Sequence, residues 1–586
     1  MTRYYFGSLP PGSPKILDAY DRLFSDPPKY VAIDTETYSL SERYLLGIGF
    51  ATPDDHAFYF TWPDPRLPWH LYMKDMASTR KIYQNAPFDL AWEVLGQFHA
   101  DIDNIEETTI LTRMLHLPVP LELISNYVPH TTHSISTYLR EYDVKAVSDL
   151  PEEAIARKCC LDCLVTMDVW KQFSTQVDWD TYLTERRFMS LLLHMSHRGI
   201  KLDQDKVKAI DAELENDLTL YFGQARALGF NPNSSDEVST MLSTHQGGNH
   251  IFSFRRGAMK PTVTDNVLSM SNHPWAALTR VARKTNKMHS RIHKWLGHER
   301  LRSHFRTDSS TWRVKSSGQH QAGQDNTQNL DSGRSVNDIH PKAGALRSVL
   351  IPDINTDDWF HISGIPDDFP VFTKFDFMQI ELRMFAFLAE DEELQWYLNY
   401  GRDNPNEPRE KWPDFHRDTQ QLFKLTDRRP AKAFNFGMLY GGADEVLAAA
   451  TGIRDLEKIR EFKLGWNNRW PKSAAYMERA RQETLRTMRV QTLFGRTLYI
   501  EDTNKELTEK HIGNTGIAFP SQGSAAEVFK RGLLMLVDAG FDPDIFVNNV
   551  HDDTWLNGRF TIPEEALSSI SQVWTPVEVE YLTYGK

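Results

Sequence analysis

The period of apolar and polar positions changes along this chain, and each change predicts a different kind of element. Three short apolar runs on the N-terminal side are separated by turn residues, a pattern typical of a β-meander. They are Tyr30–Leu40, Tyr44–Thr52 and His56–Trp62. Helical periodicity follows, with a helix predicted to begin near Pro87 and an amphipathic helix predicted over residues 152–173. A domain boundary is predicted near residue 175, where long polar helices begin.

The second half of the chain contains a strand that enters a helix, and an acid lies at the junction. In "VFTKFDFMQIELR", Asp376 is flanked by Phe375 and Phe377, so a solvated strand face explains it poorly. A carboxylate at such a junction can project from a rigid frame into a cleft. We therefore treat Asp376 as a candidate functional residue.

A further helix is predicted over "RRPAKAFNFGMLYGG", with Pro430 in its first turn and two glycines at its end. Four of its residues, spaced four apart, form one slowly drifting stripe. They are Arg428, Lys432, Phe436 and Tyr440. Two cations followed by two rings suit a nucleoside triphosphate. The alternative is an ordinary amphipathic helix with its aromatic residues in the core.

The run "VNNVHDDTW" places two aspartates behind a histidine at the end of a predicted strand. Strand alternation would point Asp552 and Asp553 in opposite directions, so each would need its own partner. One interpretation is a hairpin tip, where aspartate caps the turn. The other is that one aspartate binds a metal ion together with a distant carboxylate, for which Asp376 is the candidate.

Four acids in the N-terminal part form a second candidate metal site. Asp34 and Glu36 are two apart on a predicted strand, so their side chains share a face. Asp89 and Asp162 lie on predicted helices that could close over the end of that strand. Four such carboxylates can bind two divalent ions and cleave a phosphodiester. Taken singly, each could instead be a surface acid or a helix cap.

Composition limits the function only after the charges are located. The 66 basic and 79 acidic residues give a net charge of −13, which argues against a polyanion partner. Eleven lysines or arginines nevertheless lie between Arg280 and Lys315, and they predict a stripe that follows phosphates. The three cysteines, within Cys159–Cys163, indicate a reducing compartment and apolar packing, with zinc or redox chemistry as the alternative. No apolar run is long enough to span a bilayer, so we expect a soluble protein without membrane contact.

The segments "VAIDTETYSL" and "NAPFDLAWE" and the helix with Asp162 resemble the three exonuclease motifs of DnaQ-like 3′→5′ proofreading nucleases. The resemblance implies a ribonuclease H-like fold in which Asp34, Glu36, Asp89 and Asp162 are catalytic metal ligands. That family usually has a tyrosine four residues before the last aspartate, where it orients the attacking water. This sequence has Lys158 there.

Three later segments, "DFMQIELR", "RRPAKAFNFGMLYG" and "VHDD", resemble motifs A, B and C of the family A DNA polymerases, typified by bacterial DNA polymerase I and many phage replicative enzymes. Further matches are "RGIKLD", "FNPNSSDEV", "NTQNL", "TLFGR" and "PSQGSAAEVFK". The resemblance covers about residues 28 to 586, and its motifs are specific in combination. It implies a template-directed DNA polymerase with a 3′→5′ proofreading exonuclease.

The resemblance also implies roles for the motif residues. Asp376 and Asp552 would hold two Mg²⁺ ions, for which Mn²⁺ can substitute, while the primer 3′-hydroxyl attacks the α-phosphorus. Arg428, Lys432 and His416 would bind the triphosphate. Lys432 would also donate a proton to the leaving pyrophosphate.

Other motif residues would contact the nucleotide and the DNA. Phe436 would stack beside the incoming nucleotide, and Tyr440 would guard the template position. Glu381 would exclude a ribose 2′-hydroxyl, and Gln379 completes the nucleotide-binding set. The DNA-binding set is Arg313, Asn329, Arg383, Gln522 and His551.

Several positions depart from the family pattern. Asp553 replaces the usual glutamate of motif C, and Phe377-Met378 replaces Tyr-Ser. The arginine and asparagine that usually precede "QG" align with Asn514 and Ala518, and "TWR" replaces "TGR". These changes affect contacts more than the core mechanism.

The implied architecture is a multidomain α/β and α+β chain. A ribonuclease H-like exonuclease domain (residues 1–175) precedes a right-hand polymerase (176–586), with the thumb at about 205–300, the palm at about 301–395 and 490–586, and the fingers at about 396–489. The short segment before Asp34 leaves no room for a 5′-nuclease domain, so we expect a replicative or phage-type enzyme.

We expect this enzyme to act as a monomer in the cytoplasm of a bacterial cell or phage-infected host. Expected partners are primer-template DNA, deoxynucleoside triphosphates and replication-fork proteins such as a helicase or single-strand binding protein. Three other classes are alternatives. A stand-alone nuclease leaves the second half unused. A single-subunit RNA polymerase disagrees with Glu381 and the exonuclease motifs, and a non-catalytic DNA-binding scaffold does not explain both palm aspartates.

Overall fold

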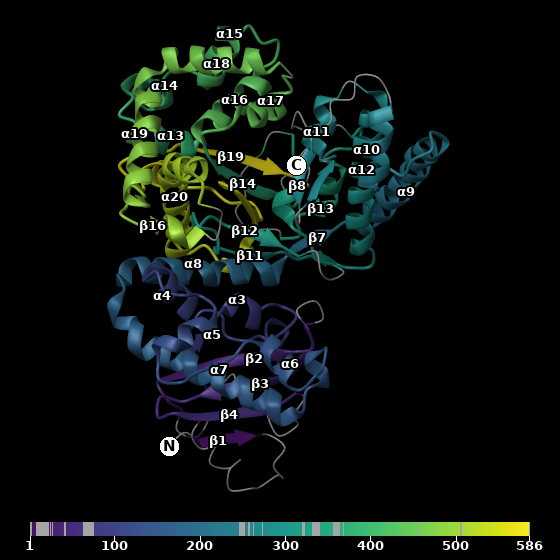
Figure 1. The fold of residues 1–586 in the computed structure, drawn as a ribbon. Helices are drawn as coiled ribbons and strands as arrows, with labels where there is room; N and C mark the ends of the chain where they lie inside the picture. Colours follow the sequence, from purple (N-terminus) through teal and green to yellow (C-terminus); the bar gives the residue numbers. More distant parts are fainter. Residues whose placement is uncertain are drawn as a thin grey trace.

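The computed structural model describes residues 3–6, 23, 25, 27–39, 43–62, 76–244, 252–255, 258–261, 263–271, 273–318, 323–330, 340–354, 362, 364–366, 369–453, 455–503 and 507–584. Figure 1 shows an N-terminal part beneath a larger region in which two groups of helices rise on either side of a sheet. None of the helices within the described ranges is both long and apolar enough to cross a membrane.

The N-terminal part folds around a six-stranded mixed sheet with the order β1-β4-β3-β2-β5-β6. β2, β3 and β4 pair antiparallel, which confirms the predicted meander. β5 and β6 continue the sheet from β2 in parallel, and β1 pairs with β4 in parallel. The strands are Arg3–Phe6 (β1), Tyr30–Thr37 (β2), Leu45–Ala51 (β3), His56–Thr61 (β4), Arg80–Tyr83 (β5) and Ile105–Glu107 (β6).

Helix α7 (Glu152–Phe173) packs across β2, β3 and β4, with the bounds that the sequence predicts (Figure 1). Gly49 of β3 permits the close approach, because a Cβ there would lie 2.6 Å from the Cys159 Sγ. All three cysteines are free and buried, which confirms the predicted apolar packing. The helix predicted near Pro87 is only the single turn α3 (Ala86–Asp89), because the apolar residues that follow reach the core from turns instead.

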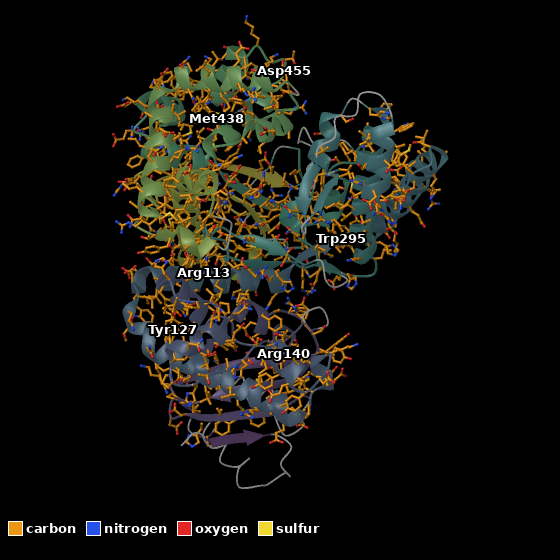
Figure 2. The ribbon with its side chains drawn as sticks, in the orientation of Figure 1. Arg113, Tyr127, Arg140, Trp295, Met438 and Asp455 are labelled. Atoms are coloured by element: carbon orange, nitrogen blue, oxygen red, sulfur yellow. The ribbon has the colours of Figure 1, made fainter. Side chains whose placement is uncertain are left out.

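Helix α8 (Trp179–Arg198) runs between the N-terminal part and the rest of the chain (Figure 1). It begins where the Asp178 carboxylate accepts a hydrogen bond from the Thr181 amide, and it ends at Gly199, whose φ is 60°. Arg113, on α4 (Thr108–Met114), lies at the same level in Figure 2. Among the described residues of the N-terminal part, the remaining α-helices are α5 (Leu121–Ile124) and α6 (Ile135–Glu141).

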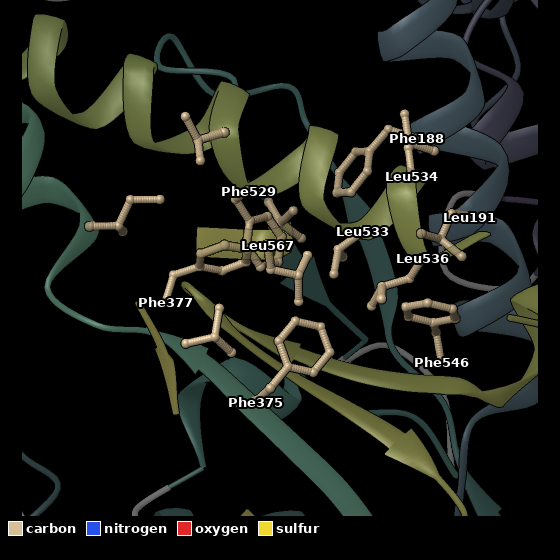
Figure 3. Packing of buried hydrophobic residues seen from close by; sticks show 14 of the residues in the cluster. Phe188, Leu191, Phe375, Phe377, Phe529, Leu533, Leu534, Leu536, Phe546 and Leu567 are labelled. Atoms are coloured by element: carbon tan, nitrogen blue, oxygen red, sulfur yellow. The ribbon is translucent and has the colours of Figure 1, made fainter. Parts of the chain in front are cut away.

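A four-stranded antiparallel sheet of order β17-β18-β14-β19 lies in the middle of the larger region that follows α8. Phe375 and Phe377 of β14 point to one face, where they pack with Phe529 and Leu533 (Figure 3). Asp376 therefore points to the opposite face. The elements are Phe372–Phe377 (β14), Phe546–Val550 (β17), Asp553–Asn557 (β18), Val577–Leu582 (β19), Ile380–Leu388 (α13), Glu509–Asp538 (α20) and Glu564–Ser568 (α21).

Two helical regions rise beside this sheet (Figure 1). We call the sheet with α13 and α20 the palm region. The fingers region consists of Glu392–Asp403 (α14), Phe415–Leu422 (α15), Arg428–Leu439 (α16), Asp444–Thr451 (α17), Leu456–Arg469 (α18) and Pro471–Thr487 (α19). The thumb region consists of Gln204–Ala227 (α9), Ser235–Thr244 (α10), Phe252–Arg255 (β8), Ala258–Pro261 (β9), Asp265–Met270 (α11) and Pro274–Ile292 (α12).

Short strands connect these regions. They are Ile200–Leu202 (β7), Arg300–Leu301 (β10), His304–Arg306 (β11), Lys315–Ser317 (β12), Leu350–Ile351 (β13), Arg489–Gln491 (β15) and Thr497–Tyr499 (β16). β7 pairs with both β10 and β13, which ties the entry of the thumb region to the segments that follow it. The antiparallel palm sheet and the helical fingers and thumb regions agree with the predicted architecture, whereas the domain limits stay predictions.

Candidate active sites

Two aspartates predicted to meet in the palm region do lie together. Asp376 stands near the end of β14, directly opposite Asp553 of β18. Asp552 occupies the turn between β17 and β18, and its carbonyl accepts a hydrogen bond of 3.2 Å from the Phe377 amide. The hairpin thus brings the turn of one strand pair to the end of β14.

The prediction that Asp552 and Asp553 point to opposite strand faces is wrong. Asp552 belongs to the turn, where His551 has a φ of 63°, and β18 begins only at Asp553. Because directly paired residues of antiparallel strands share a face, Asp553 points to the same face as Asp376. The "HDD" run therefore lies at a hairpin tip, and its aspartates face a third carboxylate, Asp376. Metal binding by these aspartates stays a prediction.

The three carboxylates repel one another in a partly buried setting. Burial, followed by the charge of Asp552, raises the pKa of Asp376 to about 7. Burial also raises the pKa of Asp552, although Arg313 and Lys432 oppose the rise. Burial raises the pKa of Asp553 to about 6, against the opposing charge of Lys374. The nearby cations do not fully offset the burial and mutual repulsion of the three carboxylates.

Lys374 is a site residue that we did not predict. Its Nζ lies 3.2 Å from the Asp553 Oδ2 and 3.3 Å from the Glu580 Oε2 of β19. It stands two residues before Asp376 on the same strand, so the two side chains share a face. This spacing was the available signal. Lys374 neutralises Asp553 and leaves Asp376 and Asp552 as the less compensated pair.

The palm carboxylates fit divalent cations with oxygen ligands. Carboxylate oxygens are the donors that Mg²⁺ prefers, and the buried Asp553 Oδ1 has no hydrogen-bond partner among the described residues. Asp376 and Asp552 would hold the ions, with Asp553 beside them. Bound there, the ions would lower the pKa of an attacking hydroxyl and neutralise phosphate charge.

The stabilisation of the fold by Mg²⁺ at the palm carboxylates is expected to depend on pH. In the unfolded chain the aspartates ionise near their ordinary pKa, whereas the folded chain keeps protons up to about pH 7 at Asp376. The folded metal-free protein therefore binds more protons, and its stability falls as pH rises through that interval. We expect Mg²⁺ to raise the unfolding temperature more at about pH 8 than at about pH 6, because it replaces those protons.

Thermal unfolding in Mg²⁺ and in a chelator, at both pH values, measures this difference. Asp376→Asn is the matched control, since it removes one titrating carboxylate and should shrink the pH dependence. An equal effect of Mg²⁺ at both pH values would contradict the expectation.

The predicted cation and ring stripe lies on α16, which begins at Arg428 as expected. Arg428 is held by Asp414, with Nε–Oδ2 and Nη2–Oδ1 distances of 2.5 and 3.1 Å. Lys432 is exposed, and its Nζ lies 5.8 Å from the centre of the Phe436 ring. Phe436 and Tyr440 are half-buried and pack against the hydrophobic cluster of the fingers region, as the alternative of an ordinary amphipathic helix expects. The charge of the exposed Lys432 nevertheless acts on Asp552.

His416 lies beside this stripe and is buried. Burial, followed by the positive charge of Arg428, lowers the pKa of His416 to about 3, so the ring is neutral. Its Nδ1 lies 2.9 Å from the Asn435 Nδ2, which assigns the ring proton to Nε2. That Nε2 has no hydrogen-bond partner among the described residues.

A second group joins three segments far apart in the sequence. Glu381 accepts a hydrogen bond from the Tyr440 hydroxyl and pairs with Arg313 at 2.9 Å. The Gln522 side chain also interacts with Tyr440. Burial, followed by the charge of Glu381, raises the pKa of Tyr440, so the phenol stays protonated and can donate. The predicted positions of Glu381, Tyr440, Arg313 and Gln522 thus form one connected cluster.

The other predicted DNA and nucleotide contacts lie in different settings. Arg383 is only 4% exposed, and its guanidinium donates to the carbonyls of Met378 and Trp574. The Arg383 side chain is therefore buried and hydrogen-bonded within the protein, and in this structure it does not lie at the surface where DNA could contact it. Asn329 is exposed, and Gln379 and His551 stand at positive φ values of 54° and 63°.

The basic stripe predicted between Arg280 and Lys315 is not one continuous surface. Many of its cations contact acids or carbonyls of the protein itself. The pairs are Arg280–Asp265, Arg291–Asp325, Arg300–Asp353, Arg306–Asp308, Arg313–Glu381 and Lys315–Asp308. Asp308 lies within the stripe itself, whereas Asp265, Asp325, Asp353 and Glu381 come from other parts of the chain, which the local sequence does not reveal.

The four N-terminal acids also gather around the end of β2. The Thr35 amide and hydroxyl donate to the Asp89 Oδ1 at 3.1 and 2.5 Å. The Lys158 Nζ lies 2.8 Å from the Glu36 Oε1 and 2.7 Å from the Asp162 Oδ2. Cys159 lies 3.4 Å from the Asp34 Oδ2. A lysine ammonium therefore stands between two of the four predicted metal ligands.

This cluster contains four acids and the single cation Lys158, and burial favours the protonated form of two of the acids. Burial, followed by the charge of Asp162, raises the pKa of Asp34 well above its ordinary value. Burial raises the pKa of Asp89 to about 8. The acid cluster fits divalent cations, but the Lys158 ammonium already forms ion pairs with both Glu36 and Asp162.

Comparison with known proteins decides the family. The profile described as DNA polymerase family A matches residues 204–577, more than half of the chain. The chain belongs to DNA polymerase family A. This family A chain is 26% identical over 480 residues to the thermostable DNA polymerase I of Thermus filiformis. That alignment covers 77% of the chain and 52% of the relative. It is 31% identical over 209 residues to DNA polymerase I of Pseudomonas aeruginosa, and that alignment covers 33% of the chain and 22% of the relative.

The chain thus spans about half or less of the length of these curated relatives. Its fold is similar to a solved structure of the POL domain of Pol1 from M. smegmatis in complex with DNA primer-template and dNTP. The TM-score is 0.68 at 15% identity, and the match covers 99% of each chain. At this identity the likeness shows the fold alone, and it includes the N-terminal part of this family A chain.

Proposed function

We propose that this chain is a template-directed DNA polymerase that adds deoxynucleoside triphosphates to a primer 3′ end. The observation that carries the proposal is that Asp376 and Asp552 lie close together in the palm region, and that the positive charge of Lys432, from the fingers region, acts on Asp552. Two-metal nucleotidyl transfer needs this combination of a carboxylate pair and a cationic helix. Family membership supports it.

The residues of the fingers region have separable tasks in this proposal. Lys432 is exposed and can neutralise the triphosphate and give a proton to the leaving pyrophosphate. Arg428, positioned by Asp414, binds the same phosphates in a fixed orientation. The His416 Nε2 proton has no partner among the described residues and is the kind of donor that a phosphate oxygen accepts.

The cluster around Glu381 supports selection of deoxynucleotides. Its carboxylate is fixed by Arg313 and Tyr440 and cannot easily move aside. A fixed acid at the sugar position would repel a ribose 2′-hydroxyl sterically, as the family resemblance implies. Phe436, on the same helix as Lys432, would stack on the incoming nucleotide.

Extension of a 5′-labelled primer on a template, with Mg²⁺ and either deoxynucleotides or ribonucleotides, tests this function. Template-dependent extension with deoxynucleotides is expected. The absence of any extension would overturn the proposal, and a preference for ribonucleotides would favour an RNA polymerase.

We propose 3′→5′ exonuclease activity as a second function, with Asp34, Glu36, Asp89 and Asp162 as its catalytic acids. Two observations favour it: the acids meet at the end of β2, and they lie on or beside a mixed sheet with flanking helices, the architecture that the resemblance implies. Proofreading at a replication fork in a bacterial or phage-infected cell, with helicase or single-strand binding protein as partners, belongs to the same proposal.

Lys158 is expected to limit this nuclease, because its ammonium competes with divalent ions for Glu36 and Asp162. Lys158→Met keeps the side-chain length but removes the charge, so the Mg²⁺ concentration needed for half-maximal primer shortening should fall by about tenfold. Primer shortening without nucleotides, measured across Mg²⁺ concentrations, gives this value.

Lys158→Arg is the matched control, since it retains the cation and should keep the high Mg²⁺ requirement. If Lys158→Met instead abolishes shortening, the lysine takes part in the chemistry and does not merely compete with metal. A chain in which Asp34→Asn leaves shortening unchanged would contradict the assignment of the site.

A further inference from the structure

The thumb region contains a cluster of metal-ligating side chains that the proposed polymerase and nuclease do not use. His289 lies on α12, and His293 directly follows the end of that helix, one turn later. Asp211 of α9 faces them, and one donor atom from each of the three residues lies within 4.8 Å of the others. Trp295, labelled in Figure 2, marks the adjacent base of the thumb region.

The separations within this cluster are long for ion pairs. The His289 Nε2 lies 3.4 Å from the Asp211 Oδ1, and the His293 Nδ1 lies 3.2 Å from the Asp211 Oδ2. The other histidine–carboxylate pairs among the described residues are shorter: 2.7 Å for His130–Asp168 and His194–Asp544, 3.0 Å for His56–Asp54, and 3.1 Å for His194–Asp103 and His304–Glu93. A charge-assisted hydrogen bond has about the shortest of these lengths.

The same separations match a shared metal ion. An ion with bonds of about 2.0–2.2 Å to nitrogen and oxygen holds tetrahedral donor atoms about 3.3–3.6 Å apart. The two imidazole rings have centres 5.4 Å apart, and one nitrogen of each ring lies within 3.4 Å of an Asp211 carboxylate oxygen. Among the described residues, Asp211 forms no ion pair with a lysine or arginine.

We propose that His289, His293 and Asp211 bind a divalent first-row transition ion such as Zn²⁺, and that the ion clamps α12 to α9. Two imidazoles and one carboxylate favour Zn²⁺, Co²⁺ or Ni²⁺ over the Mg²⁺ suited to the palm carboxylates. The His293 side chain is 63% exposed, which leaves the remaining coordination position open to water. The clamp would fix the two long helices of the thumb region at their base.

Zn²⁺ titration of the full chain by calorimetry tests the site, in a background with Asp34→Asn and Asp376→Asn that weakens both carboxylate clusters. One tight equivalent and a rise in unfolding temperature are expected. His293→Gln, at an exposed position that should not disturb folding, should weaken binding by at least about 10- to 100-fold. Co²⁺ in place of Zn²⁺ should give a visible absorption spectrum that the same replacement removes.

His298→Gln is the matched control, because His298 follows the same helix but lies outside the cluster. It should leave Zn²⁺ binding unchanged. An absence of tight binding in the background chain, or binding that His293→Gln does not alter, would overturn the proposal and leave the cluster as a pair of long ion pairs. Asp211→Asn adds a second test whose loss of Co²⁺ absorption must agree with that of His293→Gln.

Discussion

Replacement of Asp376 by asparagine is expected to lower the rate of nucleotide incorporation by at least about 10³-fold. Asp376 lies opposite Asp553, and the charge of Asp552 acts on it. Asparagine keeps the shape of the side chain but removes the negative charge that holds a divalent cation. A loss of about 4 kcal/mol of transition-state stabilisation corresponds to this factor.

Single-turnover extension of a labelled primer measures the effect. Asp552→Asn should match Asp376→Asn, whereas Asp553→Asn should lose less activity because Lys374 already neutralises Asp553. Glu580→Gln is the matched control, since Glu580 lies on the same sheet and contacts Lys374 without belonging to the three central carboxylates. It should stay close to the unaltered protein.

The stability of Asp376→Asn shows whether its loss of activity comes from lost chemistry or from misfolding. Burial and the neighbouring Asp552 raise the pKa of Asp376 to about 7, so its ionised form costs folding free energy at higher pH. Asp376→Asn should therefore raise the unfolding temperature of the metal-free protein while it abolishes incorporation. An active Asp376→Asn variant would contradict the proposed palm site, and an inactive, destabilised variant would point to a structural role.

The sequence predicted the separate pieces of the palm site better than their mutual orientation. Asp376 stood out because two buried phenylalanines flank it, and Asp552 because it follows an apolar run. The relative direction of Asp552 and Asp553 was predicted wrongly because the strand was assumed to continue through both, whereas His551 and Asp552 form a turn and β18 begins at Asp553. Lys374 could have been found from its spacing of two residues before Asp376.

Contacts between distant segments were beyond the sequence patterns. Arg313, Glu381 and Tyr440 were each predicted as site residues, but only the fold shows that they contact one another. Likewise, the basic stripe looked continuous because sequence spacing carries no information on acids from other elements. Arg291, for example, is paired with Asp325 and buried.

A buried charge network at the junction of the N-terminal part and the palm region was also missed. The Glu185 carboxylate of α8 lies 2.6 Å from the Lys530 Nζ of α20 and 2.6 Å from the Arg496 Nη2. The side chains of Glu185 and Lys530 are each only 1% exposed. Burial alone would raise the pKa of Glu185, but Lys530 and Arg496 together outweigh it and lower that pKa.

Trp312 extends this network to the N-terminal part. The Arg113 guanidinium lies 3.6 Å from the centre of its ring, and that of Arg496 lies 4.3 Å away. Trp312 adopts a φ of 57°, which costs a residue other than glycine about 1–2 kcal/mol. The family pattern has a glycine at this position, and a glycine would adopt this φ without strain. The tryptophan is strained here, but its ring contacts the guanidinium groups of Arg113 and Arg496.

Glu185→Ala is expected to lower the free energy of unfolding by about 3–5 kcal/mol, because it leaves the buried Lys530 without its carboxylate. Urea unfolding followed by tryptophan fluorescence measures the change. Lys171→Met is the control, since it breaks the exposed Lys171–Asp55 pair and should cost at most about 1 kcal/mol.

The double variant Glu185→Leu with Lys530→Met decides between two explanations of such a loss. If the cost comes from an unpaired buried charge, replacing both partners by apolar residues should recover most of the stability, because Arg496 keeps Glu527 at 2.8 Å. If the double variant is as unstable as Glu185→Ala, the network instead holds α8 against α20 through its specific geometry. A Glu185→Ala variant as stable as Lys171→Met would show that water reaches this junction and screens its charges.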